Sequence, residues 1–227
     1  MPAKSQRVTN KAKPKSKRER VATGTSKSAS SKVRLLEAAI ELFAASGFEG
    51  VSTGDVASRA GYSQAIIHYH FGSKNELWRE AMTHLLRDLD ARFPLDVKEL
   101  SDLQPLDRLK VVVRRFIALS AHSTALTSIL ARETLSDGER LKWLVSRHFQ
   151  KRVDFLDKIV AELMTTGEAH KVPSYVATQV ILLSSSFLFC MAPLIRQVHG
   201  VDPVAAAELE RLPDDLLTLF LQGLLKR

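Results

Sequence analysis

Apolar side chains recur at intervals of three and four residues along most of the chain after residue 30, which is the period of an α-helix with one buried face. Val33, Leu36, Ile40 and Phe43 form the first such stripe. Segments with the period of two that is typical of half-buried strands are few. With 45% apolar residues among 227, the chain can also bury a substantial core. The pattern therefore predicts an all-α fold.

Glycine and capping residues divide the segment after residue 30 into short helices. Ser52 with Asp55, and Ser73 with Glu76, have the three-residue spacing of a capping box. Gly47 has the place of a helix C-cap. The predicted helices run from about Ser31 to Ser46, from Ser52 to Ala60, from Ser63 to Tyr69 and from Ser73 to Phe93.

The predicted helices beyond Pro94 are longer. They cover about residues 105–122, 124–135, 137–167, 173–200 and 213–226, and proline marks the start of several of them. We therefore expect an N-terminal three-helix domain over residues 31–77 and a larger helical domain over residues 78–227.

Residues 1–30 hold nine Lys or Arg residues against one acid, so the chain's net charge of +8 comes from this segment. It has no apolar periodicity, which predicts a disordered basic tail. A flexible polycation can bind phosphate backbones or anionic lipid, or it can serve as a solubilising extension. We favour nucleic acid because of the motif that follows; a contribution to binding would steepen the salt dependence of affinity, measurable by deleting the tail.

The segment from Val172 to Ile195 has no charged residue and is long enough to span a bilayer. Its six polar side chains and Pro193 favour a buried or interfacial helix over a membrane span. The single cysteine, Cys190, excludes an intrachain disulfide and is expected to be inert, which fits a cytoplasmic protein.

The second and third predicted helices, joined by a turn at Gly61, have the layout of a helix-turn-helix, in which the second helix enters the major groove. The stretch from Arg34 to Trp78 closely resembles the N-terminal domain of the TetR family of transcriptional regulators. Ala38-Ala39, Leu42-Phe43, Gly47-Phe48, Thr53, Val56-Ala57, Gly61, Tyr69-His70-Phe71 and Ser73-Lys74 all fall at the family's spacing. This composite pattern covers about one fifth of the chain.

The resemblance implies DNA contacts at particular residues. Thr53 matches a phosphate contact at a helix N-terminus, and Lys74 matches a second one. The segment Ser63, Gln64, Ala65 and Ile66 matches the part of the recognition helix that faces base edges, where Gln64 could pair with adenine. The residues His68, Tyr69 and His70 match positions on or beside the backbone.

Two positions depart from the family pattern, because many members have Thr at the position of Ile66 and Tyr at that of His68. Each departure removes a hydroxyl that contacts phosphate. Other interpretations are that Gln64 is only solvated, that Tyr69 and Phe71 are core aromatics, which we expect for Phe71, and that the two histidines bind metal. A metal site is disfavoured because histidines at alternate helical positions point apart.

The resemblance further implies a homodimer, a palindromic operator and a helical domain that binds an effector. The dimer interface is assigned to the last two long helices, which could form a four-helix bundle with their copies. The residues expected to line the effector pocket are Phe116, Leu119, His122, Ile129, Trp143, Phe155, Phe187 and Met191. The pocket would accept a hydrophobic or amphipathic molecule that releases a repressor from DNA, with no cofactor or metal.

Two other classes remain as alternatives. A helical enzyme or ligand carrier would need a phosphate loop, a nucleophile motif or paired carboxylates, and none of these is found in the sequence. A membrane-anchored protein would use residues 172–195 as its anchor and would need detergent for extraction.

Overall fold

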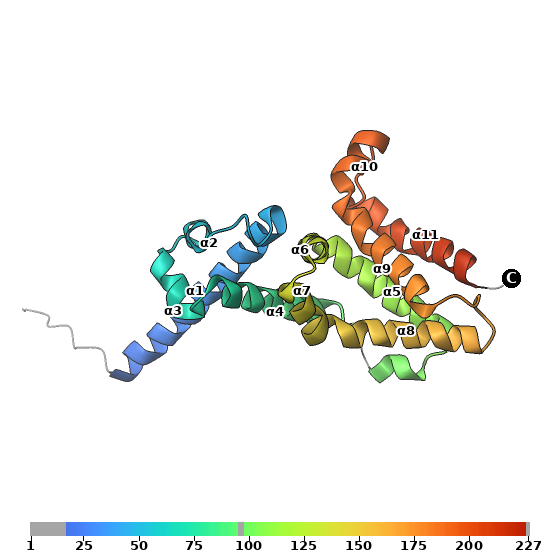
Figure 1. The fold of residues 1–227 in the computed structure, drawn as a ribbon, viewed down its shortest axis with the longest axis horizontal. Helices are drawn as coiled ribbons and strands as arrows, with labels where there is room; N and C mark the ends of the chain where they lie inside the picture. The colour runs from blue at the N-terminus through green and yellow to red at the C-terminus, as the bar shows by residue number, and fades with distance from the viewer. Residues whose placement is uncertain (1–16, 95–97, 226–227) are drawn as a thin grey trace, which may run out of the picture.

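The computed structural model describes residues 17–94 and 98–225, and within these ranges the regular structure is helical apart from one isolated bridge between Ala169 and Leu225 (Figure 1). The predicted all-α fold is confirmed. The helices are α1 (Lys17–Ser46), α2 (Thr53–Ala60), α3 (Gln64–Phe71), α4 (Lys74–Arg92), η1 (Lys98–Asp102), α5 (Pro105–His122), α6 (Ala125–Ser136), α7 (Glu139–Leu144), η2 (Val145–Phe149), α8 (Gln150–Thr165), α9 (Ser174–Cys190), α10 (Ala192–His199) and α11 (Ala206–Leu224).

Helix α1 begins at Lys17, well before the predicted start at Ser31. Residues 1–16 of the predicted tail lie outside the described residues, and the disorder expected over residues 1–30 stays a prediction. An apolar stripe is needed to bury a helix face, but it is not needed to extend a helix that has already formed, because each added residue gains a backbone hydrogen bond without a new nucleation cost.

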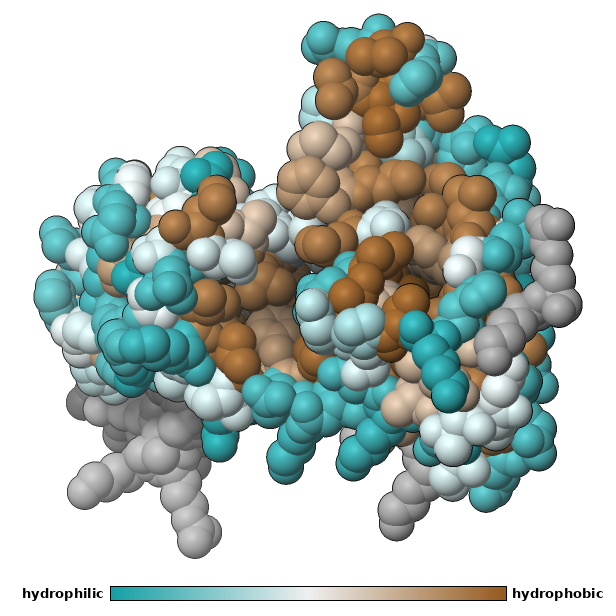
Figure 2. Space-filling model, turned by 45° about the vertical axis from the view of Figure 1, so that its right-hand side comes forward, coloured by the Kyte–Doolittle hydropathy of each residue, from teal (hydrophilic) through white to brown (hydrophobic). Residues whose placement is uncertain are grey.

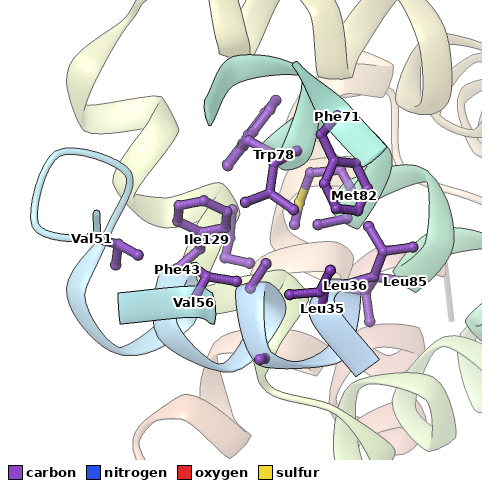
Figure 3. Close-up of a cluster of buried hydrophobic side chains, with 14 of the residues drawn as sticks. Leu35, Leu36, Phe43, Val51, Val56, Phe71, Trp78, Met82, Leu85 and Ile129 are labelled. Carbon is purple, nitrogen blue, oxygen red and sulfur yellow. The ribbon is translucent and has the colours of Figure 1, made fainter. Parts of the chain in front are cut away.

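Helices α1 to α4 share one hydrophobic core, which we call the N-terminal core. Figure 3 shows Phe43 of α1, Val56 of α2, Trp78 of α4 and Ile129 of α6 meeting there. Because α6 and the fully buried Leu144 of α7 belong to the same cluster, the apolar packing continues across the predicted domain boundary at residue 77. That boundary remains a prediction.

Helices α5, α8, α9 and α11 form a bundle at the other end of the molecule (Figure 1). Ile117, Ile159 and Phe189 are among its buried residues. Thr178 is also fully buried, and its hydroxyl donates to Oδ1 of Asp157 at 2.5 Å. This bond connects α9 to α8 through a polar group that would otherwise be costly to bury.

Three predicted helix boundaries beyond residue 136 are wrong. The helix expected over residues 137–167 is interrupted by the π-helical turn η2. The helix expected over residues 173–200 ends at Cys190, because the ring of Pro193 would clash with the carbonyl four residues earlier; Pro193 instead lies in the first turn of α10. The last helix begins at Ala206 with Pro213 inside it, because packing outweighs the loss of one backbone hydrogen bond.

Among the described helices, no single one is long and apolar enough to cross a membrane. Helices α9 and α10 have the length and apolar composition of a membrane span only when they are taken together, and the chain bends by 70° at their junction.

Candidate nucleic-acid interface and effector cavity

The geometry of α2 and α3 follows from their caps. The side chain of Ser52 accepts the backbone N–H of Asp55, and the Asp55 carboxylate accepts the backbone N–H of Ser52 at 2.8 Å. The Ser52 hydroxyl also donates to the Asp55 carboxylate at 2.6 Å, and this bond, together with the one from the Ser52 backbone N–H, lowers the pKa of Asp55. Gly61 ends α2 with a φ of 78°, a left-handed conformation that glycine adopts without a Cβ clash. The chain therefore turns sharply into α3.

Helix α3 buries only Ile67 and Phe71, so its opposite face is open to solvent. Ser63, Gln64 and Ala65 at its start are exposed, and Ser63 makes no side-chain capping bond. Three side chains expected to read bases thus lie outside the core.

Ile66 is half-buried and packs against the N-terminal core, so only part of it is exposed. This follows from helical periodicity, since residue 66 lies beside the buried Ile67. The four residues predicted to read bases are therefore not equally exposed to solvent.

Thr53 and Gln64 are joined across the turn. The Gln64 Nε2 donates to Thr53 Oγ1 at 2.9 Å, which leaves the Thr53 hydroxyl hydrogen free to donate elsewhere. Because Thr53 is also at the N-terminus of α2, its hydroxyl and the local amides form a surface suited to an oxyanion.

A surface hollow of about 550 Å³ lies beside this pair. It is lined by Thr53, His68 and Lys74 together with Glu49 and Asp55. Lys74 Nζ lies 4.3 Å from the centroid of the Phe48 ring, which holds the ammonium at the edge of the hollow. Three residues expected to meet the DNA backbone are thus brought together by separate helices.

Tyr69 and His70 point in different directions. Tyr69 is 77% exposed, so the alternative of a core aromatic is wrong, whereas Phe71 is buried as expected. His70 Nε2 lies 3.0 Å from Ser31 Oγ, and burial together with Lys32 lowers the pKa of His70. His70 therefore faces α1. In the described chain, no cluster of three or more His, Cys, Asp or Glu residues could hold a metal ion.

A second candidate site is a largely apolar cavity of about 410 Å³ among α4, α5, α6, α8 and α9. Of the residues predicted to line an effector pocket, Phe116, Leu119 and Phe155 do so. Gln179, Thr127 and Ser120 add polar groups to a wall that is otherwise mostly aliphatic.

The other five residues predicted to line an effector pocket do not line this cavity. Ile129 is buried in the N-terminal core, Trp143 packs on Trp78, and His122 contacts Phe93. Phe187 is 43% exposed, and Met191 lies at the break between α9 and α10. A helical stripe identifies apolar residues, but the rotation of each helix decides whether they meet a cavity, a core or solvent.

The prediction also missed lining residues such as Val112, Val113 and Val153. Val112 and Val113 recur at helical spacing with Leu109 and Phe116, and Val153 recurs with Phe149 and Leu156, so the sequence held a signal. Periodicity alone does not distinguish a cavity wall from a filled core.

Helix α7 and η2 contact both the apolar cavity and the N-terminal core. Leu141 and Val145 line the cavity, while Trp143 contacts Trp78 of α4 with ring centroids 5.7 Å apart. Arg140 lies over the Phe48 ring at 3.9 Å from its centroid, beside the turn that precedes α2. A movement of α7 would therefore displace residues that line the cavity and residues that contact Trp78 and Phe48.

Arg140 is held in place by a buried carboxylate. Its Nε donates to both carboxylate oxygens of Glu133 at 3.0 Å, and Glu133 is 3% exposed. Arg140 also pairs with the exposed Glu49 at 3.5 Å. One guanidinium thus joins α6, α7 and the loop between α1 and α2.

Known proteins are similar to this chain in sequence and in fold. Residues 35–81 match the model described as "Bacterial regulatory proteins, tetR family". The HTH-type transcriptional regulator BetI of Brucella abortus is 25% identical over 196 residues, covering 83% of this chain and 90% of BetI.

Solved structures share the fold. The ketosteroid transcriptional regulator KstR2 of Mycobacterium tuberculosis has a TM-score of 0.65 at 20% identity, covering 86% of this chain and 95% of that one. AibR, solved in complex with isovaleryl coenzyme A and operator DNA, has a TM-score of 0.63 at 21% identity, covering 83% and 97%.

Proposed function

We propose that the chain is a transcriptional regulator of the TetR family and not an enzyme, and that it is a repressor that binds a palindromic operator as a homodimer through its helix-turn-helix and leaves it when an apolar or amphipathic effector binds. The observation that carries this proposal is the exposure of Gln64 and Ala65 at the start of α3, beside the hollow lined by Thr53 and Lys74. A residue pair that reads bases and a pair that holds phosphates are thus adjacent.

In this proposal α3 lies in the major groove. Gln64 offers an amide that can pair with adenine N6 and N7, and Ala65 offers a methyl group for thymine. Thr53 and Lys74 contact the backbone, with His68 beside them. His70 contributes indirectly, because its contact with Ser31 holds α3 against α1.

The described DNA-facing segment has little net charge of its own. Residues 31–80 hold five basic and six acidic residues, and Glu49 and Asp55 line the same hollow as Lys74. Nonspecific attraction to DNA therefore has to come from elsewhere, and the basic residues of the N-terminal segment are its natural source.

Dimerisation is assigned to α9 and α11, where the described chain leaves apolar side chains without partners. Val176, Val180, Leu183 and Phe187 follow one helical stripe on α9 and are 39%, 51%, 59% and 43% exposed. Leu219 of α11 is 66% exposed. Figure 2 shows apolar surface gathered over this end of the molecule. A twofold-related copy would cover such a stripe and place two α3 helices on one face of a duplex.

The effector acts in this scheme by binding one arrangement of the helices better than another, since equal affinity for both would shift nothing. The cavity wall includes Leu86 and Leu89 of α4, and α7 joins the wall to Trp78 and Phe48. AibR, whose solved complex holds both an acyl coenzyme A and operator DNA, supports the combination of the two activities in one fold.

The test of the proposal is selection of bound sequences from a pool of random duplexes, using the full chain. Enrichment of a palindrome with half-sites about 34–36 Å apart would support a dimeric DNA reader. If no sequence is enriched at low salt, the proposal fails.

Replacing Gln64 with Ala should weaken binding to the selected duplex by about 1–3 kcal/mol and relax the preference at one base pair of each half-site. The reason is the loss of a bidentate amide contact. Electrophoretic mobility shifts with the selected duplex and with single-base variants would measure it. The matched control is Gln104→Ala, which changes an exposed glutamine at the start of α5 and should leave affinity unaltered.

Replacing Val180, which is 51% exposed on the α9 stripe and does not line the apolar cavity, with Asp should raise the dimer dissociation constant by about a hundredfold or more, because an unpaired charge would be buried between two copies. Analytical ultracentrifugation would measure the shift, and operator affinity should fall with it. Leu135→Asp is the control, since Leu135 is 89% exposed on α6. Equal dimer stability in the two variants would place the interface elsewhere.

A further inference from the structure

A second hollow, which we call the basic recess, adjoins the apolar cavity. It has a volume of about 410 Å³ and is lined by Asp90, Pro94, Ser146, Arg147, His148, Gln150, Lys151 and Arg152. Asp90 and Arg152 line both spaces, so the two hollows meet at this pair. One elongated molecule could therefore occupy both.

The side chains of the π-helical turn η2 line both the apolar cavity and the basic recess. Val145 and Phe149 face the apolar cavity, while Ser146, Arg147 and His148 face the basic recess. A π-turn inserts an extra residue into a helix and is found most often at functional sites. Here it allows one short segment to line an apolar wall and a polar wall together.

The recess carries an excess of positive charge. Asp90 is paired with Arg152, whose guanidinium also donates to the His148 carbonyl. Arg147 and Lys151 also line the recess, and neither forms an ion pair with any of the described residues, since Asp90 is paired with Arg152. A neutral or cationic molecule would leave them unpaired.

His148 gives a second observation that favours a polar ligand in the recess. Its Nε2 is buried and has no hydrogen-bond partner in the described structure, although buried polar atoms are normally paired. The ring packs against Trp143 with centroids 5.1 Å apart, which fixes its orientation. Burial, with help from Arg152 and Arg147, lowers the pKa of His148, and Asp90 opposes this effect.

We propose that the effector is an amphipathic anion, with an apolar chain or ring in the cavity and a carboxylate or phosphate held in the basic recess by Arg147, Lys151 and His148. This inference rests on the proposed effector function and narrows its ligand class. The bound anion would also contact the ring that packs on Trp143, which in turn touches Trp78 of α4.

The experiment titrates the full chain, without DNA, with four probes that share a twelve-carbon chain: dodecanoate, dodecyl phosphate, dodecanol and dodecyltrimethylammonium. Isothermal calorimetry below the micellar range gives each dissociation constant. We expect at least one of the two anions to bind about tenfold or more tightly than the alcohol, and the cation to bind most weakly. The carboxylate and phosphate arms distinguish the two kinds of head group. Equal affinity for anions and alcohol would overturn the proposal.

Variants separate the head-group contact from the apolar contact. Arg147→Ala and Lys151→Ala should each weaken binding of the preferred anion by about tenfold and leave dodecanol binding unchanged. The matched control is Lys158→Ala, an exposed lysine on α8 outside the recess, which should change neither. Anion binding that survives both recess variants would overturn the proposal.

These measurements are independent of the DNA test. A chain that binds dodecanoate but enriches no duplex would contradict the proposed function alone. A chain that enriches a palindrome but does not favour anions would contradict this inference alone.

Discussion

Replacing Arg140 with Ala should lower the free energy of unfolding by about 3–5 kcal/mol, because the Glu133 carboxylate would remain buried without its partner. Glu133 is only 3% exposed, and both of its oxygens accept from Arg140 Nε. The contact of the guanidinium with the Phe48 ring would be lost as well. Urea denaturation followed by circular dichroism at one fixed protein concentration would measure the change.

A second substitution tests the cause. In the Arg140→Ala background, Glu133→Gln removes the buried charge and should restore a large part of the lost stability. As a control, Arg92→Ala breaks the exposed pair with Asp88 and should cost only about 0–1 kcal/mol. If Arg140→Ala is as mild as Arg92→Ala, the buried pair is not the link between α6 and α7 that we describe.

Replacing Trp78 with Ala should lower the free energy of unfolding by about 3–5 kcal/mol, through the loss of buried apolar area and the cavity left behind. Trp78 is fully buried in the N-terminal core (Figure 3). Its ring also contacts the rings of Phe48 and Trp143. Urea denaturation again gives the measurement, with circular dichroism as the signal because the indole is itself removed.

Trp78→Phe is the matched variant. It keeps an aromatic ring and removes the buried Trp78 Nε1, which has no hydrogen-bond partner in the described structure. We expect it to retain most of the stability lost in Trp78→Ala. A Trp78→Phe variant as unstable as Trp78→Ala would show that ring size, more than aromatic contact with α7, dominates at this position.

Arg140 and Trp78 belong to different helices, yet each touches Phe48, the residue that supports Lys74 at the edge of the DNA-facing hollow. Milder variants at these positions are therefore suited to test whether effector binding still changes DNA affinity.

The helix-turn-helix could be predicted from local sequence because its determinants are local. The Ser52 and Asp55 capping box, the left-handed turn at Gly61 and the buried Phe71 each depend on neighbours within a few residues, and the structure has all three. The exposure of Gln64 followed from the same pattern, because a short helix that buries Ile67 and Phe71 must turn its other side outward.

Only the tertiary structure decided where the longer helices break and what their apolar faces meet. Local pattern assigned Ile129 and Trp143 to an effector pocket, whereas helix rotation placed them in the N-terminal core and against Trp78. The basic recess could not be predicted, because its two walls come from α4 and from η2 and α8, which are far apart in sequence. Periodicity records which side of a helix is apolar, but only the packing of distant helices determines whether that side meets a core, a cavity or solvent.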